Sequence, residues 1–184
     1  MRIIAGEWRG RKLVAPPGEL TRPTADRTRE TLFSMLTSRL GSFEDLHVLD
    51  LFAGSGALGL EALSRGAASC LFVEQDASAI KAIRANIDTL GARQKTTAQQ
   101  GSVMSLGPAK AAHQLILLDP PYGTGAGEVA LDRMLRLGWI DGSTWIALET
   151  GAKETVTVKS LECVADRRVG KAHLWLLRLS ATAA

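Results

Sequence analysis

The chain has 184 residues, of which 46% are hydrophobic and 22% are charged, and its net charge is +3 at pH 7. This composition is typical of one globular domain with a full core, and every apolar run is too short to span a membrane. The first residues become charged too soon for a signal peptide, so we expect a cytoplasmic protein.

The first 14 residues alternate loosely between apolar and polar side chains around two glycines, which predicts a short β-hairpin. Trp8 falls near its turn, and basic side chains beside an exposed indole are typical of a nucleic-acid surface. Trp8 could equally pack against the core. We expect residues 1–20 to form a basic extension and residues 21–184 to form the single main domain. The basic residues of the hairpin are Arg2, Arg9, Arg11 and Lys12.

Residues 26–40 carry an apolar stripe at helical spacing and are followed by Gly41, which predicts a helix. Arg27, Arg29 and Glu30 lie near its N-terminus. Solvation at the surface is the plain explanation for such side chains, and proximity to a functional site is the alternative.

Apolar strands and amphipathic helices then alternate along the chain, which predicts a parallel sheet covered by helices on both faces. We expect strands at residues 48–52, 70–74, 96–100, 115–118 and 145–149, and helices at residues 58–65, 78–90 and 128–137. The last two strands, at residues 161–168 and 172–179, are separated by a short turn and predict an antiparallel hairpin at one edge.

The two cysteines, Cys70 and Cys163, are far apart and lie in apolar, strand-like runs. The chain has no Cys-x-x-Cys motif and no Cys/His spacing typical of a metal site. We therefore expect two reduced core thiols and no bound metal.

Positive charge is concentrated at the two ends of the chain. Residues 1–14 and residues 151–184 each have a local charge of +3, and the segment between them has a charge of −3. Basic ends around an acidic centre suggest a polyanionic partner. For the C-terminal set, ordinary solvated surface charge is an equal alternative.

A glycine-rich loop follows the first buried strand and opens the next helix, with the pattern G-x-G-x-x-G at Gly54, Gly56 and Gly59. Glycines allow a tight turn and a close approach of backbone to ligand. Glu74, at the end of the second strand, is placed to bind ribose hydroxyls, so the pattern predicts a nucleoside-containing cofactor. Asp50 would repel a pyrophosphate but suit an ammonium or sulfonium group. The alternative is a structural acid that accepts hydrogen bonds from loop amides.

The Asp-Pro-Pro-Tyr corner (residues 119–122) follows a buried strand that cannot continue through two prolines. The corner presents a carboxylate, a proline carbonyl and an aromatic ring together. This combination is suited to holding a flat group that carries an NH₂, and a rigid turn without chemistry is the alternative.

Together, the glycine loop and the Asp-Pro-Pro-Tyr corner resemble those of class I S-adenosylmethionine methyltransferases that methylate amino groups. The tetrad is similar across enzymes acting on adenine, cytosine, guanine and a glutamine amide. Three further stretches, at residues 2–13, 22–33 and 52–66, resemble the RsmD family. That family methylates N2 of one guanine in bacterial 16S ribosomal RNA, and the match extends over essentially the whole chain.

The resemblance implies an α/β, Rossmann-like class I methyltransferase fold. We expect a mostly parallel seven-stranded sheet with an antiparallel C-terminal hairpin and a small N-terminal β-hairpin. In the reaction, Asp119 and the Pro120 carbonyl would accept the two N–H groups of the target amine, and Tyr122 would stack on the base. The catalytic set is Asp119, Pro120, Pro121 and Tyr122.

The resemblance also implies the residues that bind the cofactor and the RNA. The expected S-adenosylmethionine contacts are Asp50, Phe52, Ala53, Gly54, Ser55, Gly56, Glu74, Gln75, Ser102, Val103 and Asp119. The expected RNA contacts are Arg2, Trp8, Arg9, Arg11, Lys12, Arg22 and Arg29. The family usually places Asp or Asn after the third strand to hold adenine, and this chain departs from that pattern with Gly101-Ser102-Val103.

The implied partner is 16S rRNA within the small ribosomal subunit or a late assembly intermediate, bound by a monomer without metal or membrane. Other classes remain as alternatives: a DNA adenine-N6 methyltransferase, a glutamine methyltransferase, a non-catalytic rRNA-binding assembly factor and an NAD-dependent oxidoreductase. The 184 residues leave no space for a DNA target-recognition domain. Glutamine enzymes usually have Asn in place of Asp119.

Overall fold

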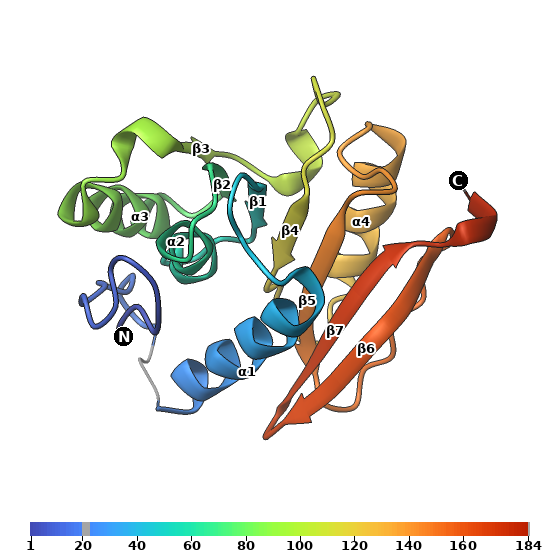
Figure 1. Cartoon of the computed structure of the whole chain (residues 1–184), viewed down its shortest axis with the longest axis horizontal. Helices are drawn as coiled ribbons and strands as arrows, with labels where there is room; N and C mark the ends of the chain where they lie inside the picture. The colour runs from blue at the N-terminus through green and yellow to red at the C-terminus, as the bar shows by residue number, and fades with distance from the viewer. Residues whose placement is uncertain (20–22, 184) are drawn as a thin grey trace.

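A twisted seven-stranded sheet organises the computed structural model, which describes residues 1–19 and 23–183 (Figure 1). The strands are β1 (His47–Leu51), β2 (Ser69–Glu74), β3 (Thr96–Gln100), β4 (Leu115–Leu118), β5 (Trp145–Gly151), β6 (Leu161–Val169) and β7 (Ala172–Leu179). Their order in the sheet is β3-β2-β1-β4-β5-β7-β6. The first five strands run parallel, and β7 pairs antiparallel with both β5 and β6. The expected sheet with its C-terminal hairpin is confirmed.

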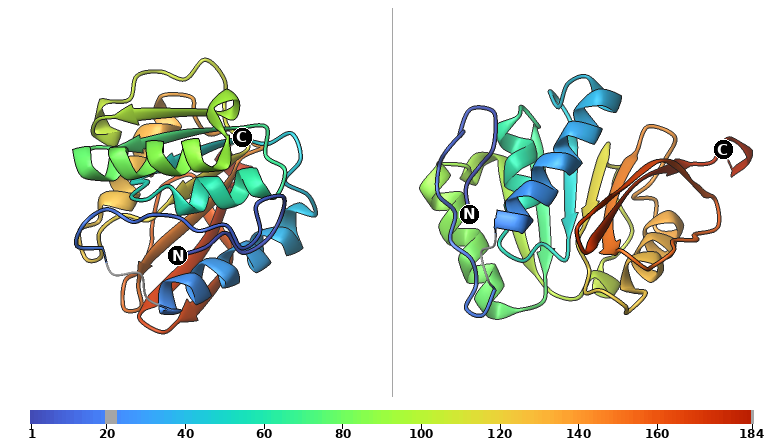
Figure 2. Two further views of the ribbon diagram at one scale, coloured as in Figure 1. Left: turned by 90° about the vertical axis from the view of Figure 1, so that its left-hand side faces the viewer. Right: turned by 90° about the horizontal axis from the view of Figure 1, so that it is seen from below.

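Helices cover both faces of this sheet (Figure 2). α1 (Pro23–Leu40), α2 (Ala57–Ser64) and α3 (Ala77–Leu90) pack on one face, and α4 (Ala126–Arg136) packs on the other. Single 3-10 turns are η1 (Arg93–Lys95), η2 (Val103–Ser105) and η3 (Ala181–Ala183). Within residues 1–19 and 23–183, every helix is too short or too polar to cross a bilayer.

The core has two layers because side chains alternate along each strand. In β4, Leu115 and Leu117 face the helices α1 to α3, whereas Ile116 and Leu118 face α4. All four side chains are buried, as expected for a central parallel strand between two layers of helices. Strand β4 therefore carries the Asp-Pro-Pro-Tyr corner on a rigid, fully packed support.

Element boundaries differ from the expected ones where the backbone has special geometry. Helix α1 starts at Pro23, before the expected residue 26, because proline fits the first turn, where an N–H would have no partner. Strand β1 ends at Leu51, because Phe52 has φ 55° and cannot continue an extended strand.

The N-terminal segment (residues 1–14) folds back on itself as the sequence predicted, but it is packed against the core. Its two arms are joined by one antiparallel bridge between Arg2 and Lys12 and by backbone hydrogen bonds, from Ile3 N to Arg11 O at 2.9 Å and from Leu13 N to Met1 O at 3.0 Å. Ile3, Trp8 and Leu13 are buried in the core beside α2 and α3. The expectation of an exposed, stacking Trp8 indole is wrong, since the residue is 8% exposed.

Backbone groups of the N-terminal segment pair with side chains of α2 and α3. The Glu61 carboxylate accepts hydrogen bonds from the N–H groups of Ile4 and Ala5, at 2.9 and 3.0 Å. Asn86 exchanges two hydrogen bonds with the backbone of Val14. The segment is therefore built into the main domain, and its charged side chains and Val14 face solvent.

The two cysteines have different surroundings. Cys70 on β2 is buried, as expected. Cys163 is exposed on the edge strand β6, which corrects its assignment as a core thiol. Both are free thiols. An edge strand has neighbours on one side only, so an apolar run there does not imply full burial.

Candidate active site

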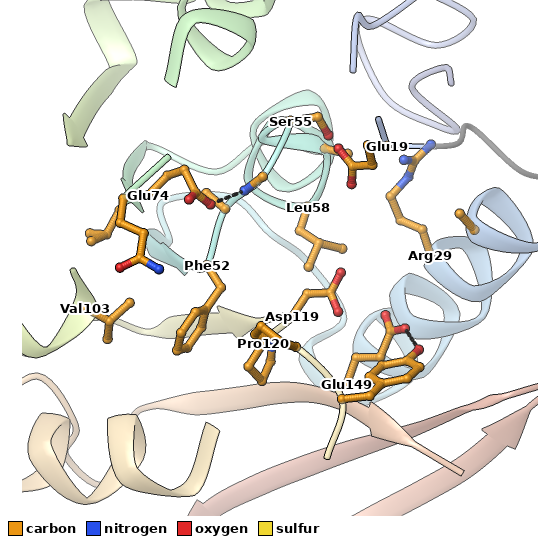
Figure 3. Close-up of a pocket in the computed structure, with 18 of the residues that line it drawn as sticks. Glu19, Arg29, Phe52, Ser55, Leu58, Glu74, Val103, Asp119, Pro120 and Glu149 are labelled. Carbon is orange, nitrogen blue, oxygen red and sulfur yellow. Dashed lines mark hydrogen bonds between the residues drawn. The ribbon is translucent and has the colours of Figure 1, made fainter. Parts of the chain in front are cut away.

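The loops at the carboxyl end of the parallel strands surround a cavity of about 550 Å³ (Figure 3). Side chains after β1, β2, β3, β4 and β5 all line it, because parallel strands direct their carboxyl ends to one edge. The first turns of α1 close the cavity from the opposite side. The glycine loop, Glu74, the Gly101–Val103 region and the Asp-Pro-Pro-Tyr corner therefore meet at one place.

The glycine loop between β1 and α2 adopts the backbone conformations that its sequence suggested. Gly54 and Gly56 have φ values of 55° and 80°, in the left-handed region that favours glycine. At Gly59, a Cβ atom would lie 2.5 Å from the Phe72 ring, so only glycine lets α2 pack this closely on β2. Phe52 also has a left-handed conformation, and such strain is found most often at functional sites.

Glu74 stabilises this loop while facing the cavity. One carboxylate oxygen accepts a hydrogen bond from Gly54 N at 2.8 Å, and the other accepts one from Asp76 N at 2.9 Å. A carboxylate has about four acceptor positions, so each oxygen keeps one for a ligand. Phe52, Val73 and Val103 line the cavity beside it with apolar surface.

Asp50 does not belong to the described lining of the cavity. Its side chain is buried, and Oδ2 accepts a hydrogen bond from Gly59 N at 2.9 Å. Burial raises the pKa of Asp50 to about 8, and the nearby charge of Glu74 adds to the shift. The structure thus corrects the expectation of a carboxylate facing the cofactor. Asp50 is the structural acid of the alternative interpretation, and it fixes the start of α2.

The Asp-Pro-Pro-Tyr corner presents its side chains to the cavity as the sequence suggested. Asp119 is open to the cavity and enclosed by protein elsewhere, and this enclosure raises its pKa well above the usual range. The charge of Glu149 is the next cause of the raised pKa. Pro120 is buried, whereas Tyr122 remains 47% exposed and can contact a ligand.

Glu149, at the end of β5, is a site residue that sequence reasoning missed. The Tyr122 hydroxyl donates a hydrogen bond to its Oε1 at 2.5 Å, which fixes the orientation of the ring (Figure 3). Burial raises the pKa of Glu149 and of Tyr122. Its position in the sequence could have identified it. Glu149 lies near the carboxyl end of a parallel strand, as Glu74 does, and Asp119 directly follows such an end.

Glu19 is a second missed acid, contributed by the loop after the N-terminal segment. Burial and then the charge of Glu74 raise its pKa. No sequence signal identified it, because its position depends on how that loop packs. The acids surround the cavity without forming a metal centre: across residues 1–19 and 23–183, no group of three or more suitable side chains could hold a metal ion.

Arg29 is the basic residue that lines the cavity from α1. It is only 5% exposed, so it is not a solvated surface group, and its place in the lining bears out the alternative of proximity to a functional site. Its contact with RNA stays a prediction. Its guanidinium donates to the Arg2 carbonyl and to Asp26, and it lies 4.0 Å from the buried Glu61 carboxylate. Arg29 therefore ties α1 to the N-terminal segment and α2.

Other expected contacts have mixed placements. Ala53, Gly54, Ser55, Gln75, Ser102 and Val103 line the cavity, whereas Gly56 shapes the loop without lining it. The Ser102 hydroxyl accepts a hydrogen bond from Met104 N at 3.1 Å and can still donate one. Arg2, Arg9, Arg11 and Lys12 are exposed on the N-terminal segment, and Arg22 lies outside the described residues.

Comparison with known proteins places this geometry in a family. The chain matches the family described as conserved hypothetical protein 95 over residues 1–178. It is 39% identical over 150 residues to ribosomal RNA small subunit methyltransferase D of Escherichia coli K12, covering 82% of this chain and 74% of that protein. The Haemophilus influenzae protein of the same name is 36% identical over 179 residues, covering 92% of this chain and 89% of that one.

Solved structures agree with this relationship. A putative methyltransferase from Escherichia coli superimposes with a TM-score of 0.84 at 35% identity, over 98% of both chains. A putative methylase from Haemophilus influenzae does so with a TM-score of 0.80 at 31% identity, over 97% of both chains. The methyltransferase fold expected from the sequence is thereby confirmed over essentially the whole length.

Proposed function

From the premise that this chain belongs to the conserved hypothetical protein 95 family, with the ribosomal RNA small subunit methyltransferase D proteins, we propose that it methylates small-subunit rRNA. The reaction is methyl transfer from S-adenosylmethionine to the N2 amino group of a guanine in 16S rRNA. We expect the substrate to be the small subunit or a late assembly intermediate. The observation that carries the proposal is the cavity shared by the glycine loop, Glu74 and the Asp-Pro-Pro-Tyr corner.

The glycine-loop side of the cavity fits S-adenosylmethionine. Glu74 has acceptor positions left for two ribose hydroxyls, and Phe52 and Val103 offer apolar surface for a purine ring. The carboxylates around the cavity favour a cationic sulfonium over an anionic group. When bound, S-adenosylmethionine supplies an electrophilic methyl group.

The Asp-Pro-Pro-Tyr corner activates and orients the amine. The lone pair of guanine N2 is delocalised into the ring, so the free amine is a poor nucleophile. Asp119 and the Pro120 carbonyl each accept one N–H, which favours tetrahedral nitrogen and the positive charge that develops on it. Tyr122, held by Glu149, stacks on the base and fixes its plane. Asp119 then takes the surplus proton.

Glu149 gives the cavity a preference for guanine over adenine. Guanine carries an N–H donor at N1 beside its N2 amine, and a second carboxylate can accept it. Adenine presents an unprotonated N1 at the same place, which a carboxylate repels. Asp119 and Glu149 line one cavity, and the charge of Glu149 raises the pKa of Asp119, so the two carboxylates are close enough to face a single Watson–Crick edge.

Labelled methyl transfer tests the proposal directly. Small subunits from a strain lacking this modification are incubated with the protein and S-adenosylmethionine carrying a labelled methyl group. Label should appear on N2 of one guanine of 16S rRNA. Label on adenine, or only on DNA or protein, would contradict the proposal. An absence of label with intact RNA binding would favour the assembly-factor alternative.

Replacement of Asp119 separates catalysis from cofactor binding. In Asp119→Ala, we expect turnover to fall by on the order of 100- to 1,000-fold or more, because the charged acceptor for the amine is lost. Affinity for S-adenosylmethionine, measured by calorimetry, should change little. Asp132→Ala, which removes an exposed acid on α4, is the matched control and should retain full turnover. Retained turnover in Asp119→Ala would defeat the mechanism.

A further inference from the structure

A second groove, of about 500 Å³, lies between the start of α1 and the tip of the β6–β7 hairpin. It is separate from the catalytic cavity and from the N-terminal segment. Three of its lining residues are arginines, and none is acidic. We name it the arginine groove, and its lining residues are Pro23, Thr24, Arg27, Thr31, Arg167, Arg168, Val169 and Gly170.

The arginine groove gathers positive charge without compensation. Among the described residues, Arg27, Arg167 and Arg168 form no ion pair and no side-chain hydrogen bond. Two nearby acids are engaged elsewhere: Asp26 pairs with Arg29, and Asp166 pairs with His173. Like charges held close together repel one another, and an anionic ligand relieves that repulsion.

Exposed lysines extend this positive surface. Lys171 continues from Gly170 in the hairpin turn, and its carbonyl accepts a hydrogen bond from Ala152 N at 2.9 Å. Lys153 follows Ala152 and is also exposed. The basic surface therefore runs from the groove toward the loop after β5.

Sheet register places the arginine groove at the same edge as the catalytic cavity. Ala172 pairs with Gly151 at the end of β5, so the hairpin turn lies at the carboxyl edge of the parallel strands. The first turns of α1 separate the two sites. Thr24 and Arg27 face the groove, whereas Thr28 and Arg29 face the cavity.

We infer that the arginine groove binds backbone phosphates of the RNA strand next to the target nucleotide. This inference rests on the proposed function. A base must leave its stack to reach the cavity, and contacts to the flanking backbone are then needed to hold the strand in position. Guanidinium groups bind phosphate through two parallel hydrogen bonds, so arginine is well suited to hold the backbone in this way. Phosphate contacts set register and orientation without reading sequence.

Neutralising the arginine groove tests the inference in the full-length protein. For Arg27→Gln, Arg167→Gln and Arg168→Gln combined, we expect the KM for small subunits to rise at least tenfold. The slope of log affinity against log salt should fall in magnitude by roughly 0.7–0.9 for each phosphate that the variant no longer binds. The kcat at saturating subunits and the affinity for S-adenosylmethionine should stay within twofold, since the groove does not line the cavity.

A control variant makes the same charge change at the opposite edge of the sheet. Lys95 precedes β3, Lys110 precedes β4, and Arg136 ends α4, so all three lie at the amino edge. The combined Lys95→Gln, Lys110→Gln and Arg136→Gln protein should keep the wild-type KM and salt slope. Equal KM and salt slope in the two triple variants would overturn the inference.

Single substitutions keep the test decisive if the triple variant folds poorly. Arg168→Gln should raise the KM several-fold, and Arg168→Lys should restore it only in part because lysine lacks the bidentate fork. An unchanged KM in both Arg168→Gln and Arg168→Lys would also overturn the inference.

Failure of the proposed function gives a different result: the wild-type protein would then place no label on guanine N2. RNA binding by the groove would still be measurable by fluorescence anisotropy.

Discussion

Asp119 and Glu149 illustrate how two identical chemical groups acquire separate tasks within one cavity. Both have raised pKa values, caused first by burial, and for Asp119 next by the charge of Glu149. Both line the cavity, and Glu149 accepts a hydrogen bond from the Tyr122 hydroxyl. In the proposed reaction, Asp119 accepts a hydrogen bond from the amine to be methylated. Binding of a base that donates N–H groups to both would favour their ionised forms.

Glu149→Gln should weaken the preference for guanine. The variant loses a charged acceptor for N1–H, and a hydrogen bond to a charged group contributes about 1.5–3 kcal/mol, so kcat/KM should fall roughly 10- to 150-fold. The useful competitor is 2-aminopurine at the target position, which keeps the amine but has an unprotonated N1. The wild-type protein should strongly prefer guanine to 2-aminopurine. In Glu149→Gln, the ratio of kcat/KM for guanine to kcat/KM for 2-aminopurine should be smaller, because the glutamine amide can donate to the unprotonated N1.

Glu162→Gln, an exposed change on β6, is the control for this experiment. It should leave both kcat/KM and the ratio of guanine to 2-aminopurine at wild-type values. An unchanged ratio in Glu149→Gln would exclude a role for Glu149 in choosing the base, while leaving its contact with Tyr122 intact.

Asp50 should make folding stability depend on pH. Its pKa is raised to about 8 in the folded protein, so the folded state holds a proton that the unfolded state has already lost. Stability is therefore greatest below the ordinary Asp pKa and decreases as pH rises toward 8. Asp50→Asn removes this titration, so its stability relative to wild type should rise by roughly 1 kcal/mol per pH unit between pH 5 and 8. Urea unfolding of both proteins between pH 5 and 8 measures this difference in the free energy of unfolding. A difference that stays constant with pH would contradict the prediction.

At the scale of elements, the N-terminal segment and α2 depend on one buried acid. Glu61 is fully buried and accepts hydrogen bonds from two backbone N–H groups and from Arg65. Arg29 adds a second positive charge at 4.0 Å. The segment has little regular structure of its own, so these contacts and three apolar side chains hold it in place.

Replacing Glu61 should therefore destabilise the protein strongly. Glu61→Ala leaves the N–H groups of Ile4 and Ala5 without their acceptor and removes the buried carboxylate that faces Arg29 and Arg65, and we expect a loss of about 3–5 kcal/mol in urea unfolding. Asp132→Ala is the matched control, because Asp132–Arg136 has the same i,i+4 spacing but is exposed. That change should cost about 0.5 kcal/mol or less. Similar losses in the two variants would show that burial of the first pair is unimportant.

At the scale of the whole molecule, an acidic cavity is flanked by two basic surfaces. The N-terminal segment packs on α2 and α3, and the arginine groove lies between α1 and the C-terminal hairpin. Charge outside the cavity suits a polyanion, and charge inside it suits a cationic cofactor. If the proposed function holds, we expect the two ends of the chain to contribute to one substrate surface around the cavity.

Salt should separate the two kinds of binding. RNA affinity should fall steeply with salt, because binding releases counterions from many phosphates. Affinity for S-adenosylmethionine should change little, because the ligand is small and the charges that it meets within a cavity are screened less than charges on an open surface. Combining Arg9→Gln, Arg11→Gln and Lys12→Gln should reduce the RNA salt slope, measured by fluorescence anisotropy. The amino-edge triple variant serves again as the control. A slope unchanged by the N-terminal substitutions would remove that segment from the RNA surface.

Much of the fold followed from local patterns in the sequence. Strand β4 is recognisable from four apolar residues in a row, α3 from its apolar stripe and Gly91, and the glycine loop from its spacing. These signals are local, because side-chain period and turn geometry depend on neighbouring residues. The Asp-Pro-Pro-Tyr corner was found in the same way, since prolines must end a strand.

Other features depended on residues distant in sequence. For Trp8 and Arg29 the sequence left a surface and a buried placement open, because the partners that decide it, Ser64 and Glu61, are distant in the chain. Asp50 has the right position for a ligand, but packing of α2 turns its carboxylate toward Gly59. Glu149 reaches the site only because β5 pairs with β4 in parallel.

The sequence alone determined the strand–helix order, the glycine loop and the Asp-Pro-Pro-Tyr corner, because each is encoded within a few consecutive residues. Only the tertiary structure decided which acids share the cavity, that the N-terminal segment is packed into the core, and that three arginines meet between α1 and the hairpin. Those arrangements arise from strand register and from burial of apolar surface, and both depend on the whole chain at once.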